Sequence, residues 1–126
     1  ILEQGWDKEA RVINRAGKWS IRQVLAFAEH CEMVIGPETG VLNAVSMLPM
    51  PKIVFLSHSS HENLTRDWVN TCALEPKDTP CYPCHRMHYT WEFCKQDEAT
   101  GTALCQVNID LERAWSAVDS KLRKAA

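Results

Sequence analysis

Short apolar runs bounded by glycine and proline dominate the central part of this chain. Residues 33–35 form one such run, which ends at a Gly-Pro pair, and residues 53–56 form another. A continuous apolar run closed by such breakers predicts a buried strand. Between them, Val41–Leu48 carries apolar residues at helical spacing and is stopped by two prolines. The predicted order of strand, turn, helix and strand is that of a crossover unit in a parallel sheet.

The preceding stretch repeats this order. Val12–Asn14 is a short run that predicts a strand, and Ser20–His30 follows as a helix whose first residue is a good N-cap. We therefore expect adjacent parallel strands at Val12–Asn14, Met33–Ile35 and Ile53–Leu56, with the two helices as crossovers. A further short strand is expected within Asp67–Leu74.

The C-terminal residues predict an amphipathic helix. Asp110 is placed to cap it, and apolar residues then recur at spacings of four, three and four, at Leu111, Trp115, Val118 and Leu122. This stripe is expected to pack on the sheet or to reach toward another domain.

Composition narrows the class of protein. The chain has 126 residues and a net charge of -2, so one globular domain fits and no basic surface argues for nucleic acid. No apolar run approaches the length of a transmembrane helix. Six cysteines are present, and the apolar setting of Cys31 favours a reducing cytosol over secretion. A cytoplasmic protein is expected, peripheral to the inner membrane if it is part of a larger enzyme.

Polar residues follow both central strands. Thr39 and Gly40 lie between a strand and a helix, where exposed amides favour phosphate, whereas the carboxylate of Glu38 suits ribose or sugar hydroxyls. His58 and Ser59 come directly after the next strand, so their loop is expected at the same edge of the sheet. The alternative for Glu38 and Thr39 is a simple capping turn. The alternative for His58 and Ser59 is a solvated loop.

The remaining motif is a Cys-x-x-Cys pair followed by two more cysteines. Cys81, Cys84, Cys94 and Cys105 could form a tetrahedral zinc site, with His85 or His88 in place of one cysteine, or could be packed thiols or disulfides. Two prolines near the pair predict an irregular loop rather than a redox motif at a helix start. We expect the four cysteines to lie near one another whatever their chemistry.

The central stretch resembles the donor-binding segment of glycosyltransferase family 9, the bacterial heptosyltransferases of lipopolysaccharide core assembly. The residues in register with that family are Ile35, Glu38, Thr39, Gly40, Val41, Asn43, Ala44, Pro51 and Val54. The family usually has Asp at the position of Glu38 and often His at that of Asn43. Lys18, in a Gly-Lys turn before the first helix, also resembles the family and could approach a diphosphate.

The resemblance implies a partial C-terminal domain of a GT-B enzyme: an α/β, Rossmann-like three-layer parallel sheet with an irregular Cys-rich loop and a C-terminal helix. On this basis residues 1–75 are part of the nucleotide-sugar-binding domain, 76–107 its Cys-rich segment and 108–126 the terminal helix. A complete domain of this type has five or six strands, so its opening strands are expected to precede this chain. The exposed sheet edge would then allow a homodimer of the fragment.

The implied activity is an inverting transfer from an ADP-heptose-like donor to a lipid-linked or glycan acceptor, with no required cofactor. The catalytic base would belong to the missing N-terminal acceptor domain, so the fragment alone is expected to be inactive. The expected donor-binding residues are Lys18, Glu38, Thr39, Gly40, Val41, Asn43, His58 and Ser59. The alternative is a non-catalytic binding module, or one stabilised by zinc, on the same fold.

Overall fold

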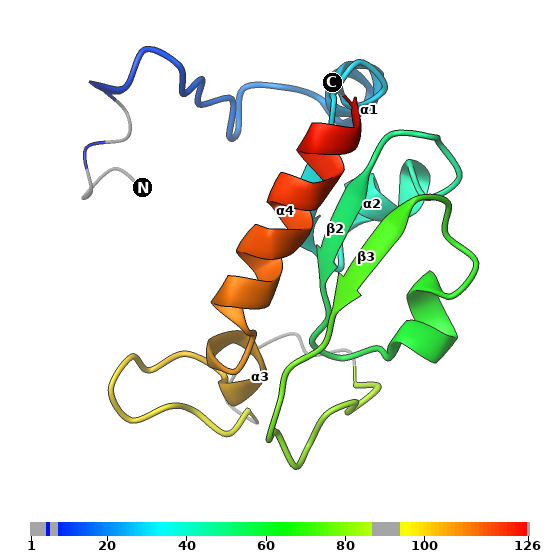
Figure 1. Ribbon diagram of the computed structural model, residues 1–126. Coiled ribbons are helices and arrows are strands. Elements are labelled where there is room, and N and C mark those ends of the chain that lie inside the picture. The colour runs from blue at the N-terminus through cyan, green and yellow to red at the C-terminus, as the bar shows by residue number, and fades with distance from the viewer. Residues whose placement is uncertain (1–4, 6–7, 87–93, 126) are drawn as a thin grey trace.

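The protein, seen here in a computed structural model, is described at residue 5 and over residues 8–86 and 94–125 (Figure 1). Three short strands alternate with helical segments, and two helices close the chain. The elements in order are α1 (Ile21–Ala28), β1 (Val34–Pro37), α2 (Gly40–Ala44), β2 (Lys52–Phe55), the π-helical turn η3 (His61–Thr65), β3 (Thr71–Leu74), α3 (Leu104–Val107) and α4 (Leu111–Ala125).

The strands form one parallel sheet in the order β1-β2-β3, with Ile53 of β2 paired to Ile35 on one side and to Cys72 on the other. Parallel neighbours need a crossover connection, which α2 and η3 supply. The α/β class and the parallel pairing of the two central runs are therefore confirmed. The Rossmann-like three-layer domain stays a prediction.

The prediction of a strand at Val12–Asn14 is wrong. These residues have no regular structure and are exposed, Ile13 to 69%, and the segment before α1 leads away from the sheet (Figure 1). An apolar sequence alone does not make a strand, because the backbone N–H and C=O groups need a neighbouring strand. The third strand is β3, which confirms the strand expected within Asp67–Leu74, and it lies on the far side of β2 from β1.

The first predicted helix is confirmed. The Ser20 side chain accepts a hydrogen bond from the Gln23 N–H, and the Gln23 side chain accepts one from the Ser20 N–H at 2.9 Å. This reciprocal pair is a capping box, which satisfies two backbone donors that a helix start otherwise leaves unpaired.

The second predicted helix is shorter than expected. It was predicted to reach Leu48, but α2 ends at Ala44 and turns follow. The fully buried Lys52 accounts for the difference, since its Nζ donates to the carbonyl oxygens of Leu48 at 2.6 Å and Met50 at 2.9 Å. These bonds hold the chain in a turn before Pro51 and deliver it into β2.

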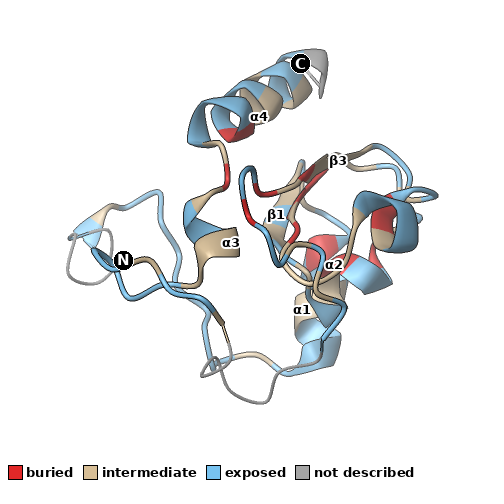
Figure 2. Ribbon diagram, turned by 90° about the horizontal axis from the view of Figure 1, so that it is seen from below, coloured by how far each residue is buried: buried red, intermediate tan, exposed pale blue. Residues whose placement is uncertain are grey.

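Strand β2 supplies apolar side chains to two separate cores. Figure 2 shows buried residues in β3, α2 and α4 around it. Ile53 belongs to one with Leu74, Ile109 and Ala114, which links β2 and β3 to α4. Val54, the next residue along the strand, belongs to the second core together with Leu42 and Leu56. Leu42 brings α2 into this core. Both Ile53 and Val54 are fully buried, which confirms that the second run is buried on both faces of the sheet.

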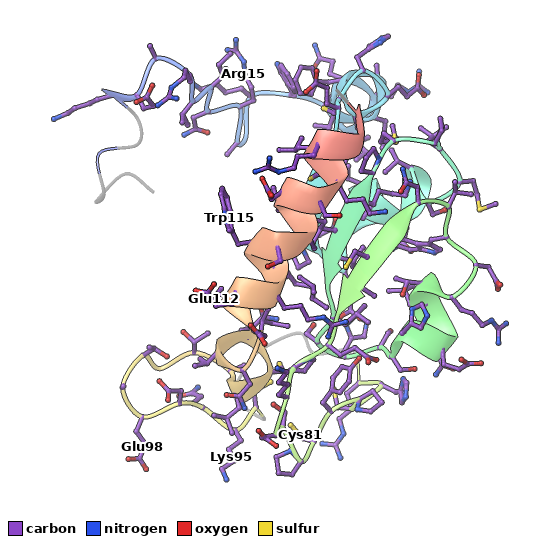
Figure 3. All side chains as sticks on the ribbon, viewed as in Figure 1. Arg15, Cys81, Lys95, Glu98, Glu112 and Trp115 are labelled. Atoms are coloured by element: carbon purple, nitrogen blue, oxygen red, sulfur yellow. The ribbon has the colours of Figure 1, made fainter. Side chains whose placement is uncertain are left out.

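Helix α4 packs on the sheet, but not through the predicted stripe. Ala114 is buried against Ile53 and Leu74, whereas Leu111 is 77% and Trp115 70% exposed, and Trp115 points away from the sheet (Figure 3). The predicted start is confirmed, because Asp110 Oδ1 accepts from the Arg113 N–H at 2.9 Å. The helix meets this core through Ala114, Ala117 and Val118. In the stripe only Val118 packs against this core.

The described parts of the segment between β3 and α4, residues 75–86 and 94–110, have little regular structure. Their elements are the single turn α3 and an isolated antiparallel bridge between Gln96 and Ala103. None of the described residues from 80 to 108 is buried. Among the helices that the structure describes, none has the length and apolarity that crossing a membrane requires.

We predict that the two faces of α4 respond oppositely to substitution. Ala114→Leu should lower the free energy of unfolding by about 1–3 kcal/mol, because the larger side chain overfills the contact with Ile53 and Leu74. Leu111→Ser, on the exposed face, should change it by less than about 0.5 kcal/mol. Urea unfolding followed by circular dichroism measures both. Equal losses in the two variants would contradict this assignment of the buried face.

Candidate functional site

The carboxylate of Glu38 joins the ends of two neighbouring strands. Its Oε2 accepts hydrogen bonds from the Ser57 N–H at 3.1 Å, the Ser57 hydroxyl at 2.7 Å and the His58 N–H at 3.0 Å. Oε1 accepts from the Ser59 N–H at 2.9 Å, and His58 Nδ1 lies 2.5 Å from Oε2. The loop after β2 is therefore wrapped around the first polar side chain after β1.

This carboxylate is buried but fully hydrogen-bonded. Only 3% of the Glu38 side chain is exposed. Burial by itself raises the pKa of a carboxyl group, but here the His58 N–H, the Ser57 hydroxyl, the Ser59 N–H and the charge at His58 together outweigh burial. The pKa of Glu38 is consequently held below its ordinary value, and the group stays ionised at neutral pH.

A second carboxylate follows β3. Glu75 Oε1 accepts from the Tyr82 hydroxyl at 2.9 Å and from the His61 N–H at 3.2 Å. Burial, and then the neighbouring Glu75, raises the pKa of Tyr82 above its ordinary value, so the phenol remains a donor. Glu75 thereby ties the start of η3 to the loop that carries the Cys-x-x-Cys pair.

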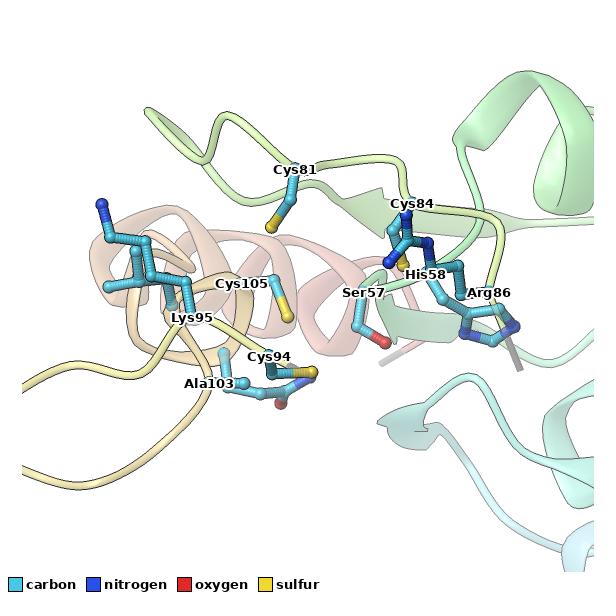
Figure 4. Close-up of a pocket in the computed structure, with 11 residues that line it drawn as sticks. Ser57, His58, Cys81, Cys84, Arg86, Cys94, Lys95, Ala103 and Cys105 are labelled. Carbon is cyan, nitrogen blue, oxygen red and sulfur yellow. The ribbon is translucent and has the colours of Figure 1, made fainter. Parts of the chain in front are cut away.

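A cavity of about 590 Å³ opens beside these loops (Figure 4). Ser57 and His58 form the wall nearest the sheet, and the rest comes from the segment between β3 and α4. The hydrogen bond from the His85 N–H to the His58 carbonyl, 2.8 Å long, closes the junction between the two parts. The lining residues are Ser57, His58, Cys81, Cys84, Arg86, Cys94, Lys95, Ala103, Leu104, Cys105 and Gln106.

The four cysteines of the predicted cluster all line this cavity. Burial raises the pKa of the Cys105 thiol, and the nearby Cys94, Cys81 and Cys84 raise it further. The four cysteines thus border one cavity, whereas the expected close approach of their sulfur atoms stays a prediction. No disulfide links any of the six cysteines. As the described side chains lie, no three Cys, His, Asp or Glu residues are close enough together to hold a metal ion. His88, the other predicted substitute ligand, lies outside the described residues.

The other predicted donor-binding residues lie around the start of α2. Thr39 and Gly40 are exposed, and a side chain added at Gly40 would meet no atom within 4 Å. Asn43 Nδ2 donates to the Thr39 carbonyl at 3.0 Å, which stabilises this turn, and Val41 is half-buried. Lys18 is exposed in a turn before α1 and is not among the described residues that line the cavity.

Sequence reasoning assigned Glu38 and His58 to one sheet edge but did not anticipate that they bind each other. Direct contact of Glu38 with a sugar stays a prediction, and its burial favours an indirect role in which it positions the loop after β2. Ser57 and Arg86 were not predicted, although both line the cavity. Ser57 could have been identified as a site residue from its position just after a buried strand. No feature of the sequence marked Arg86.

Comparison of the chain with protein-family models, with curated proteins and with solved structures gave no match.

We predict that Glu38→Gln lowers the free energy of unfolding at neutral pH by about 1–3 kcal/mol, since the amide cannot accept all of these bonds. Because the folded-state pKa of Glu38 is lowered from 4.5, its stabilisation is complete above that pH and is lost as pH falls through the folded value. Urea unfolding from pH 7 to pH 3 should therefore show a smaller acid-induced loss in the variant.

The control for this prediction is Glu62→Gln. Glu62 pairs with Arg66 at 2.7 Å on the surface, and 69% of its side chain is exposed, so its contribution to stability should be small. If Glu38→Gln were as stable as Glu62→Gln across this pH range, the carboxylate would not organise the loops as described.

Proposed function

We propose that this chain is the nucleotide-sugar-binding part of a glycosyltransferase that resembles the heptosyltransferases of family 9. The proposal assigns donor binding to the crevice at the carboxyl edge of the sheet. An inverting transfer of an ADP-heptose-like sugar to a lipid-linked or glycan acceptor is the proposed reaction of the whole enzyme, with the base supplied by a separate acceptor domain. A partial Rossmann-like domain of GT-B type is the fold proposed with it.

The observation that carries this proposal is the bonding of Glu38 to the loop after β2. Thr39 and Gly40 follow Glu38 directly, so its hydrogen bonds to His58 and Ser59 bring the polar ends of two adjacent parallel strands together. Such a junction at the carboxyl edge of an open parallel sheet is the usual position for a nucleotide. The exposed Gly40 backbone lacks a side chain that would keep a diphosphate away.

The electrostatics of the junction also suit a diphosphate. The charge of Glu38 is neutralised by backbone N–H groups and by His58, so it does not project toward a ligand. The His58 side chain is bonded to Glu38 and is 39% exposed. Arg86 lines the adjoining cavity, so its guanidinium can offset charge on a departing nucleoside diphosphate. Leaving-group stabilisation is thus the chemistry assigned to this chain.

The test is binding of nucleotide sugars to the purified chain by calorimetry, with ADP-, UDP- and GDP-sugars compared. We expect ADP-sugars to bind best. Gly40→Val should weaken that binding about tenfold or more, a loss of about 1.4 kcal/mol, because a branched side chain blocks approach to the backbone. Folding should survive, since the added side chain meets no neighbouring atom.

Met47→Val is the matched control, because it places the same side chain at a 67% exposed position in the turn after α2. Its donor affinity should equal that of the unsubstituted chain. A folded Gly40→Val variant with unchanged affinity would falsify the donor-site assignment. Absence of nucleotide-sugar binding altogether would favour the non-catalytic binding module.

A further inference from the structure

The imidazole ring of His58 is held in one orientation by Glu38. Its Nδ1 lies 2.5 Å from Glu38 Oε2, and the His58 N–H donates to the same oxygen at 3.0 Å. Because the pKa of Glu38 is lowered, the carboxylate has no proton to donate, so Nδ1 carries the hydrogen of this bond. The ring is therefore fixed with Nδ1–H toward Glu38, which leaves Nε2 as the nitrogen that can bond elsewhere.

Nε2 is available to a ligand. No residue in the described part of the chain forms a hydrogen bond with it, and 39% of the His58 side chain is exposed, against 3% for Glu38. His58 lines the cavity at the end nearest the sheet, where Arg86 lies as well (Figure 4). Ligand pockets typically contain a few polar groups in fixed positions that orient the ligand, and Nε2 of His58 meets that description.

We propose that His58 Nε2 binds a hydroxyl group of a carbohydrate ring, either the ribose or the sugar of the nucleotide-sugar donor. This contact rests on the proposed function and adds a specificity-determining residue to it. Glu38 is then a positioning residue, which acts on the hydroxyl only through the ring that it orients.

The hydrogen-bonding capacity of Nε2 favours a hydroxyl over a phosphate. Nε2 accepts a hydrogen bond when the ring is neutral and donates one when the ring is protonated. A hydroxyl both donates and accepts, so it can bond to Nε2 in either state, whereas an ionised phosphate oxygen only accepts. Arg86 is always charged and presents several donors, so it is the better phosphate partner at this end of the cavity.

The position of His58 also fits the proposed donor site. Glu38 directly precedes Thr39 and Gly40, and the same carboxylate holds the His58 ring and the Ser59 N–H. The turn proposed to receive the diphosphate and the ring proposed to bind a hydroxyl thus belong to one hydrogen-bonded unit. That arrangement is expected where two groups contact different parts of a single ligand.

Nuclear magnetic resonance of the ¹⁵N-labelled chain at pH 7 tests the orientation of the ring. Long-range proton–nitrogen spectra distinguish the two tautomers, and the signals of His58 are those lost in His58→Asn. We expect a proton on Nδ1, and we expect ADP-heptose to shift the Nε2 resonance of His58. In Glu38→Gln both tautomers should appear, since an amide can accept from Nδ1 or donate to it. A neutral ring protonated at Nε2, or an Nε2 resonance that ADP-heptose leaves unchanged, would overturn the proposal.

His58→Asn tests the ligand contact by calorimetry with ADP-heptose, ADP and pyrophosphate. The asparagine amide can still donate to Glu38 from about the position of Nδ1, but nothing replaces Nε2. If the hydroxyl belongs to the sugar, ADP-heptose binding should weaken about three- to tenfold while ADP binding is kept. If it belongs to the ribose, both should weaken by this factor. Pyrophosphate has no carbohydrate ring, so its binding should not change.

His30→Asn is the matched control, because His30 is exposed just after α1 and is not among the described residues that line the cavity. It should leave all three affinities unchanged, and urea unfolding shows whether both variants remain folded. A folded His58→Asn chain that binds ADP-heptose and ADP as tightly as His30→Asn would overturn the hydroxyl contact and leave the donor site in place. An equal loss of pyrophosphate binding would make His58 a phosphate ligand and overturn the contact too. Absence of nucleotide binding by the unsubstituted chain would instead overturn the donor site, and the contact with it.

Discussion

The buried carboxylate of Glu38 is the interaction on which this site depends. In a parallel sheet, the loops that follow the strands lie at the same edge. The sheet does not by itself determine the conformation of those loops. Here one ionised side chain after β1 accepts the N–H groups of three consecutive residues after β2. An uncompensated charge at 3% exposure would be strongly destabilising. The Glu38 carboxylate therefore needs the hydrogen bonds of the loop after β2, and the loop needs the carboxylate to hold its N–H groups. This bonding determines the shape of the sheet edge.

The same arrangement recurs in a weaker form at the next strand. Glu75 after β3 binds the start of η3 and the hydroxyl of Tyr82, and Lys52 at the opposite end of the sheet binds two carbonyl groups of the preceding turn. With strands of four residues each, the sheet is too small to order its connections by packing alone. Charged side chains bonded to backbone groups fix the loops instead, at both ends of the strands.

Away from the sheet, few of the described residues are buried. The cores around Ile53 and Val54 account for β2, β3, α2 and α4, whereas the Cys-rich segment is joined to them by Glu75, the His58 carbonyl and the Lys77–Asp110 pair at 2.6 Å. The exposed Leu111 and Trp115 on α4 belong to neither core.

The sequence by itself determined the local features. Continuous apolar runs located β1 and β2, although the Gly-Pro pair expected to end the first run lies within β1. Ser20 and Asp110 marked two helix starts. The tertiary structure decided the features that depend on contacts with a distant part of the chain. Val12–Asn14 has strand-like residues but forms no strand, and on α4 Ala114 is buried whereas Trp115, in the predicted stripe, is 70% exposed. Glu38 likewise bonds to a loop about twenty residues away, and no local pattern encodes a contact that exists only once two strands are side by side.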